Sequence, residues 1–170
     1  MTGIFQKDSL QLPLIYRGQV VYNLDPNKLG RIKVKVFGIF SNEIPIGNLP
    51  WAVPAFPVYT GSGNGFGYFA VPEVGTNVFV FFEAGDFYQP VYFASAPDAV
   101  HGLPSERTTN YPYRKVAKTK SGIVIFVDDQ AKVVRLTHPT GKYIQMDGLG
   151  NINIVGAQIT ITGDRVDINP

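Results

Sequence analysis

The stretch NINIVGAQITITGDRVDINP, residues 151–170, contains a short unit that repeats every seven residues. Each unit has two apolar residues two positions apart, at Ile152 and Ile154, Ile159 and Ile161, and Val166 and Ile168. Turn-forming residues keep the same step, at Gly156, Gly163 and Pro170. Because side chains alternate along a strand, both apolar residues of a unit point to one face. A strand of about four residues cannot bury that face without a partner.

The repeat therefore predicts an assembly of several chains. One chain alone would leave its apolar stripe and its strand edges exposed, which favours aggregation. Three chains wound about a common axis would bring the apolar residues together and pair the backbone groups of neighbouring chains. We expect a homotrimer with a core formed by Ile152, Ile154, Ile159, Ile161, Val166 and Ile168. A one-chain solenoid covered by another protein is an alternative, and so is an edge hairpin, although a hairpin needs no regular repeat.

The composition indicates an all-β protein. The 170 residues are 45 % hydrophobic, and 13 prolines and 18 glycines separate short runs rich in Val, Ile, Phe and Tyr. No window has the period of an amphipathic helix. The formal net charge of +2 gives no sign of a nucleic-acid partner, and the absence of cysteine excludes disulfides and thiolate metal sites. Without a secretory signal or a long apolar run, the chain is expected to be soluble and made in a cytoplasm.

The first part of the chain predicts a small barrel. Strands are expected over residues 18–24, 30–39, 68–72, 76–85 and 90–96. Apolar and basic residues alternate over the second range, at Ile32, Val34 and Val36 against Arg31, Lys33 and Lys35. Such short strands with glycine-rich connections favour a closed barrel of the oligonucleotide/oligosaccharide-binding (OB) type, with a short sandwich as the alternative.

The polarity of the chain predicts four segments. Residues 1–17 form an N-terminal arm, residues 18–97 the barrel, residues 98–120 a polar linker or collar, and residues 121–170 a spike of short strands with tight turns. The linker contains four basic residues, which we interpret as a solvated connector rather than a nucleic-acid site: Arg114, Lys115, Lys118 and Lys120.

No motif predicts an enzyme, a metal site or a cofactor site. His101 and His138 lie in polar turn contexts without a second ligand at a metal-binding spacing. Two carboxylate pairs suggest glycoside cleavage, but turn positions explain them better: Glu83 with Asp86, and Asp128 with Asp129. The sequence GSGNGFG at 61–67 lacks the spacing of a phosphate-binding loop, so it predicts a flexible barrel loop.

Aromatic residues in the barrel suggest a second possible activity, the stacking of single-stranded nucleic acid bases. The candidates are Tyr68, Phe69, Phe79 and Phe81. Phe79 and Phe81 share one face of a strand that is expected to be central, so we predict that both pack in the core.

Two stretches resemble the central spike proteins of contractile phage tails and the related valine-glycine-repeat spikes of type VI secretion. The first comprises NLDPNKLGRIKVKVFGI at 23–39, LPWAVPAFP at 49–57 and VPEVGTNVFVFFEAGDFYQPVYFASAP at 71–97. The second, TKSGIVIFVDDQAKVVRLTHPTGKYIQMDGLGNINIVG at 119–156, is similar to the passage from barrel into triple-stranded β-helix. The barrel motif residues are Asp25, Pro26, Gly30, Arg31, Trp51, Pro72, Glu73, Gly75, Glu83, Gly85, Asp86 and Pro90.

The resemblance implies a non-enzymatic homotrimer in the virion, with an OB barrel seated on the baseplate hub and an intertwined β-helix or β-prism. Tail contraction would drive this spike transiently into the host outer membrane, with no nucleic-acid partner. Residues 97–120 are too few for the lysozyme domain of some relatives, and no His-x-His tip is present. The tip is expected to be absent, supplied by a separate capping protein or located beyond Pro170.

Three alternatives remain open. The protein could be the spike of a bacterial secretion system, or a carbohydrate- or single-strand-binding barrel with an oligomerising tail. Glycan hydrolysis by the carboxylate pairs is the third. The first residues of the arm match no element of the family and are expected to contact the hub.

Overall fold

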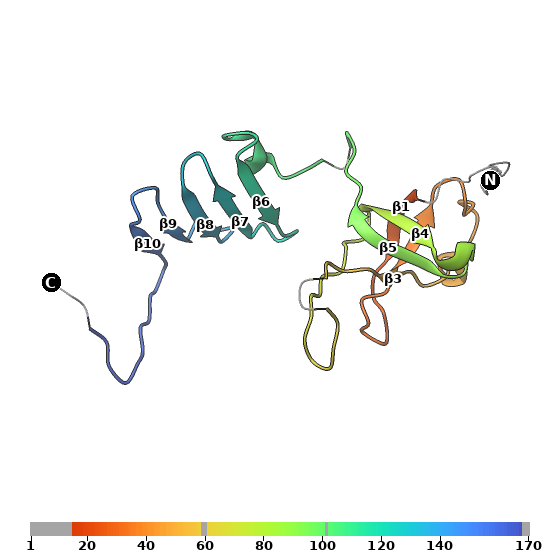
Figure 1. Ribbon diagram of the computed structural model, residues 1–170, viewed down its shortest axis with the longest axis horizontal. Coiled ribbons are helices and arrows are strands. Elements are labelled where there is room, and N and C mark those ends of the chain that lie inside the picture. Colours follow the sequence, from red (N-terminus) through yellow and green to blue (C-terminus); the bar gives the residue numbers. More distant parts are fainter. Residues whose placement is uncertain (1–14, 59–60, 101, 168–170) are drawn as a thin grey trace, which may run out of the picture. The chain divides into compact units, whose positions relative to one another are not determined.

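The computed structural model describes residues 15–58, 61–100 and 102–167. It divides into two compact units, Met1–Gly102 and Leu103–Pro170, which are described separately. The regular elements of the described residues are strands and the short 3-10 helices η1 (Ile46–Asn48), η2 (Glu83–Gly85) and η3 (Ser105–Thr108) (Figure 1). The prediction of an all-β protein is confirmed.

The first unit is a five-stranded barrel. Its strands are β1 (Tyr16–Tyr22), β2 (Lys33–Val36), β3 (Val53–Pro54), β4 (Asn77–Phe82) and β5 (Pro90–Ser95), in the sheet order β2-β1-β4-β5-β3. Strands β3 and β5 are parallel, and the other neighbours are antiparallel. Ile32 and Ala52 exchange backbone hydrogen bonds of 3.0 and 2.8 Å, which join the two edge strands. This closed Greek-key order is that of an OB fold.

Two details of the barrel differ from the sequence prediction. Residues 68–72 form no strand, and the third strand is β3 instead. A strand of two residues, one of them Pro54, carries too little alternation to be recognised. In addition, β1 begins at Tyr16, inside the range predicted as arm, because Tyr16 pairs with Val80 of β4.

The barrel core consists mainly of valine and isoleucine side chains. The buried cluster includes Val20, Ile32, Val34, Val36, Ala52, Val78, Val80, Phe82 and Tyr92. On β4, the valines and Phe82 point inward, so Phe79 and Phe81 point outward, where both contact the ring of Phe93. The prediction that Phe79 and Phe81 pack in the core is therefore wrong. Both faces of β4 are apolar, so the alternation in the sequence could not tell which face is inside.

The close approach of β1 to β2 requires a glycine at position 18. A Cβ atom on Gly18 would lie 2.5 Å from Val34 Cγ1 and 2.8 Å from the Lys35 carbonyl oxygen. We expect Gly18→Ala to lower the free energy of unfolding of the barrel by about 1–3 kcal/mol through overpacking. Gly47→Ala is the matched control, since no atom lies within 4 Å of its added Cβ. Denaturant unfolding measures both, and equal stabilities would contradict this close packing.

The second unit is one antiparallel meander. Strands β6 (Arg114–Lys118), β7 (Val124–Asp128), β8 (Val133–Thr137), β9 (Tyr143–Met146) and β10 (Ile152–Val155) each pair with the next strand (Figure 1). The first of them lies inside the range predicted as linker. Residues 156–167 follow β10 without forming a strand. The hydrogen-bonded ladder of the described chain thus ends at the outer edge of β10.

Within the described ranges there is no helix with the length and hydrophobicity of a membrane span.

Candidate functional site

One face of the second sheet is apolar across all five strands. Strand register aligns its side chains in two rows. One row runs through Ala117, Ile125, Leu136, Ile144 and Ile154. The other runs through Val127, Val134, Met146 and Ile152 and begins at Lys115. We call these nine apolar residues the apolar face.

The apolar face is open to solvent in the single chain. Its large side chains are exposed by between 41 % at Val127 and 65 % at Ile152. A continuous patch of branched aliphatic side chains on a protein surface marks an interaction surface. The face is therefore a candidate assembly surface.

The opposite face of the same sheet mixes apolar side chains, such as Val124 and Phe126, with charged side chains that have partners within the chain. Arg114 stacks on the ring of Phe126 at 4.4 Å, and Arg135 stacks on Tyr143 at 3.9 Å. The Arg135 guanidinium also donates hydrogen bonds to Thr137 Oγ1 (3.0 Å) and to Gln145 Oε1 (3.3 Å). Charged groups held by aromatic rings and neighbouring oxygens are compatible with water, so this face has less need of a partner than the apolar face.

The structure brings two residues of the predicted trimer core onto this surface. Ile152 and Ile154 lie on β10, at the end of the two rows. Ile159, Ile161 and Val166 lie outside any strand, with exposed fractions of 53, 67 and 47 %. Ile168 lies outside the described residues. The role of all six in a trimer core remains a prediction.

Sequence analysis missed the other members of the apolar face. Successive strands from β7 to β10 are spaced by nine or ten residues at their first positions, so they do not share the seven-residue step. The period-2 alternation that would have revealed them is present in VVRL at 133–136 and in YIQM at 143–146. The alternation does not show which residue of one strand lies beside which residue of the next, so the two rows could not be predicted.

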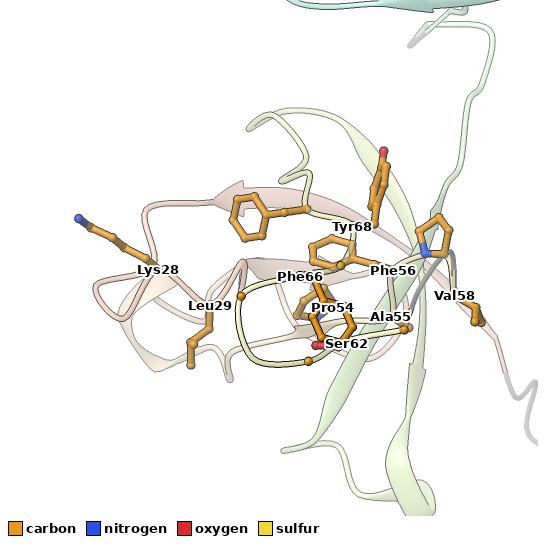
Figure 2. A pocket seen from close by; sticks show the side chains of 15 residues that line it. Lys28, Leu29, Pro54, Ala55, Phe56, Val58, Ser62, Phe66 and Tyr68 are labelled. Carbon is orange, nitrogen blue, oxygen red and sulfur yellow. The ribbon is translucent and has the colours of Figure 1, made fainter.

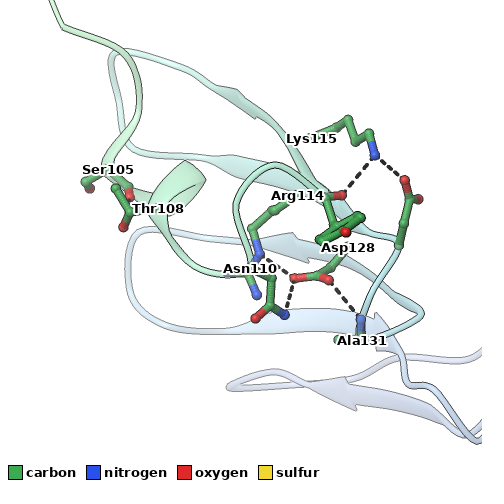
Figure 3. Close-up of polar contacts among 9 residues, drawn as sticks. Ser105, Thr108, Asn110, Arg114, Lys115, Asp128 and Ala131 are labelled. Carbon is green, nitrogen blue, oxygen red and sulfur yellow. Dashed lines mark hydrogen bonds and ion pairs between the residues drawn. The ribbon is translucent and has the colours of Figure 1, made fainter.

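A buried carboxylate fastens the start of this sheet. Asp128 is fully buried and accepts hydrogen bonds from Asn110 Nδ2 (3.0 Å), Arg114 Nε (2.8 Å) and the Ala131 N–H (2.9 Å) (Figure 3). The Ala131 N–H, followed by Arg114 and Asn110, holds the pKa of Asp128 below its usual range, although burial acts in the opposite direction. Asp128 thus ties the η3–β6 connection, strand β6 and the β7–β8 turn together.

The neighbouring Asp129 has a different environment. It is about half exposed and pairs with Lys115, whose ammonium also donates a hydrogen bond to the Tyr113 carbonyl oxygen (Figure 3). Since the oxygens of Asp128 are all engaged in structural hydrogen bonds, the pair Asp128 and Asp129 has the geometry of a turn rather than that of an acid and a base.

In the barrel, the motif residue Asp25 closes the loop between β1 and β2. Its carboxylate accepts hydrogen bonds from the N–H groups of Asn27 (3.0 Å), Leu29 (2.9 Å) and Arg31 (3.3 Å). The Arg31 side chain adds two more, from Nε at 3.0 Å and Nη2 at 2.7 Å. Arg31 also stacks over Trp51 at 5.2 Å. Three residues of the motif therefore form one structural clamp.

This clamp predicts a pH dependence. The Arg31 guanidinium, followed by the three N–H groups, holds the pKa of Asp25 well below its usual range, against the effect of burial. The carboxylate therefore stabilises the fold above about pH 4, its pKa in the unfolded chain, and this stabilisation is lost as the pH falls through the lowered folded pKa. Asp25→Asn should be less stable at neutral pH and should show a weaker pH dependence of the denaturation midpoint below pH 4. Glu43→Gln, at an exposed position, is the control and should behave like the original chain.

Four further motif residues, Glu73, Gly75, Glu83 and Asp86, lie in turns on either side of β4. Before it, Gly75 adopts a positive φ of 91°, and the Thr76 N–H donates to the Glu73 carbonyl oxygen at 3.1 Å. After it, the Asp86 N–H donates to the Glu83 carbonyl oxygen at 2.9 Å. The Asp86 carboxylate accepts hydrogen bonds from the Tyr88 N–H and the Gln89 amide. Glu83 and Asp86 therefore lie in one hairpin turn rather than on two sides of a cleft.

A comparison with known protein families finds a match that covers this barrel. Residues 16–96 match the model of the type VI secretion system/phage-baseplate injector OB domain. These residues are an injector OB domain. The match begins at the first residue of β1 and ends one residue after β5, so the family region and the barrel coincide. The predicted resemblance of the barrel to the OB domain of baseplate spikes is confirmed. A search of curated proteins gives no match.

The injector OB domain also has an aromatic groove. It is lined by Lys28, Leu29, Pro54, Phe56, Tyr68, Phe69 and the glycine-rich loop (Figure 2). Phe56 makes edge contacts with Tyr68 and Phe69, both at 5.8 Å between ring centroids. The aromatic candidates for base stacking therefore fall into two groups, because Phe79 and Phe81 contact Phe93 instead. They do not form one stacking platform.

The one histidine that the structure describes, His138, lies in a turn of the second unit. His138 Nδ1 lies 2.8 Å from Thr140 Oγ1 within a turn, and His101 lies outside the described residues. Among the residues that the structure describes, no group of three or more His, Cys, Asp or Glu side chains could hold a metal ion.

Proposed function

We propose that this protein is the central spike of a phage baseplate. In this proposal three copies assemble through their second units, the injector OB domains seat on the hub, and tail contraction drives the spike through the host envelope. The observation that carries the proposal is the apolar face, which is exposed in a single chain and continues into the repeats at 151–170.

Burial of the apolar face supplies the energy for assembly. Full burial of one large aliphatic side chain contributes about 1.5–3 kcal/mol. The described face carries eight such side chains per chain, apart from Ala117, and they are 41–65 % exposed in the single chain, so burial of each contributes about half of that value. Summed over the chains of an assembly, this gain offsets the cost of bringing the chains together. Three sheets with these faces turned inward would form a prism with a dry core and with Arg114 and Arg135 on its outer walls.

The repeats favour three wound chains over a closed pair of sheets. Residues 156–167 form no strand within the chain, although Gly156 and Ala157 would suit a two-residue hairpin turn. Backbone groups of a neighbouring chain can supply the hydrogen bonds that this segment lacks. A continuous ladder between chains around an apolar core would also give the stiffness that a needle requires.

Absolute mass in solution tests the proposal directly. We expect light scattering after gel filtration to give three chain masses for the full protein, and we expect the trimer to resist SDS. A shortened chain that ends at Gly102 should be monomeric or associate weakly. A full chain with the mass of one copy would refute the spike and favour a binding barrel.

A cysteine pair distinguishes winding between chains from folding within one chain. Asn153 and Thr160 are seven residues apart, and the chain has no native cysteine. In a wound trimer, position 153 of one chain lies next to position 160 of a neighbour, so oxidation of an Asn153→Cys/Thr160→Cys variant should give covalent multimers on a non-reducing gel. A hairpin within one chain would place the same two positions opposite each other and give only cross-linked monomers. Either single-cysteine variant is the control.

The spike of a bacterial secretion system is the second candidate, because the family description covers both machines. Mass spectrometry of purified phage particles separates the two. We expect peptides of this chain in the particles, and their absence from phage of a producing culture would favour the secretion system.

A further inference from the structure

The outer surface of the OB domain carries an apolar patch that the spike proposal does not use. It consists of Ile15, Phe79, Phe81 and Phe93, and a shallow pocket lies over part of it. The Phe93 ring lies 6.1 Å from that of Phe79 and 5.9 Å from that of Phe81. Ile15 is 53 % exposed and Phe93 is 37 % exposed. We call these four residues the outer patch.

The chain passes along this patch just before it begins strand β1. In the antiparallel register of β1 and β4, Arg17 pairs with Phe79 and Tyr16 with Val80. The next position places Ile15 beside Phe81. The Arg17 guanidinium lies over the Phe79 ring at 5.2 Å, at the edge of the patch. Residues 1–14 are therefore tethered directly to the outer patch.

The composition of residues 1–14 is complementary to the patch. The segment contains Ile4, Phe5, Leu10, Leu12 and Leu14. Its acidic residue, Asp8, is complementary to Arg17, and Pro13 suits a change of chain direction just before β1.

The segment is also long enough. Fourteen extended residues span up to about 46–50 Å, whereas the patch crosses three neighbouring strands, which are about 10 Å across. A short tether keeps the segment at an effective concentration in the millimolar range, so weak apolar contacts suffice to hold it in place.

We propose that residues 1–14 fold back within their own chain and cover the outer patch. This inference goes beyond the spike function and replaces the expected contact of the arm with the hub. The leucines and Phe5 then bury the rings of β4 and β5, and Asp8 lies near Arg17. A second copy of the chain is the competing occupant.

Thiol labelling tests whether the patch is covered in the full chain. The register places Ala94 opposite Phe79, and Ala94 is exposed on the described barrel. We expect Ala94→Cys to react about tenfold more slowly with a maleimide than the same cysteine combined with Phe5→Ser and Leu12→Ser, as for a cover that is closed nine-tenths of the time. Ser62→Cys, in the glycine-rich loop, is the control and should react equally in both backgrounds. Equal rates at position 94 would overturn the proposal.

Cross-linking identifies the occupant. Ala94→Cys is combined in turn with Gln6→Cys, Ser9→Cys and Gln11→Cys, and each protein is oxidised, boiled in SDS and run without reductant. The proposal expects at least one pair to give a disulfide-linked species with the mass of one chain. Covalent dimers would assign the patch to a second copy, and no cross-link with any pair would also overturn the proposal. Because the cover forms within one chain, it should persist even if light scattering shows a monomer, so its failure and that of the spike are separable.

Discussion

Ile144→Asp is expected to abolish the trimer and leave single chains in solution. Ile144 lies in the middle of the apolar face, between Leu136 of β8 and Ile154 of β10 in one row. In the proposed prism, three carboxylates would be buried near one axis, where each loses its hydration and repels the other two. No basic residue belongs to the same row, so none of the described side chains in it would neutralise them. Light scattering should give the mass of one chain at concentrations where the original protein is trimeric.

The neighbouring residue provides a matched control for this variant. Gln145 lies on the opposite face of the same strand, where its side-chain oxygen accepts a hydrogen bond from Arg135 at 3.3 Å. Gln145→Glu introduces the same charge beside that guanidinium, so the trimer should persist. A trimeric Ile144→Asp protein would show that the apolar face is not the interface. Loss of the trimer in both variants would point to a general effect of charge.

The sequence predicted the parts of the fold that depend on local alternation. Residues 30–39 gave β2 with Val34 and Val36 buried as predicted, but Lys33 on the face expected to be wet is buried too and donates a hydrogen bond to the Gly47 carbonyl oxygen at 2.6 Å. The segment NVFVFF at 77–82 gave a strand, but its two apolar faces left the direction of Phe79 and Phe81 undetermined. The direction is set by packing against β1 and β5, which is a property of the closed barrel.

Contacts between distant residues were beyond the sequence alone. The resemblance to baseplate spikes singled out Asp25, Arg31 and Trp51, but not that Asp25 binds Arg31 or that Arg31 stacks on Trp51. The two rows of the apolar face depend similarly on turn lengths, because a shift of one residue in any turn would move a strand's side chains to the other face. The repeat at 151–170 could be recognised without knowing turn lengths or strand register, since its seven-residue period can be read directly from the sequence.

Asp128→Ala is expected to be the most destabilising single change in the second unit. The substitution leaves Arg114 with one stacked ring and no carboxylate, and it leaves the Asn110 amide and the Ala131 N–H without their acceptor. Removing one partner of a buried ion pair is strongly destabilising because the other charge stays uncompensated. We expect the melting temperature of this unit to fall by about 10 °C or more. Circular dichroism during heating measures the change.

Asp129→Ala is the control for Asp128→Ala, because it removes an acidic side chain from the same turn without breaking the hydrogen bonds of Asp128. Its pair with Lys115 is exposed to solvent, and exposed pairs contribute little, so the melting temperature should move by no more than about 2 °C. The same contrast should appear in the pH dependence. Since the folded pKa of Asp128 is lowered, its stabilisation is complete above the unfolded pKa of about 3.9 and is lost as the pH falls through the folded value. The original chain and Asp129→Ala should therefore lose stability in acid, whereas Asp128→Ala, already without the carboxylate, should lose less. Equal losses in all three would show that the acid sensitivity of this unit has another origin.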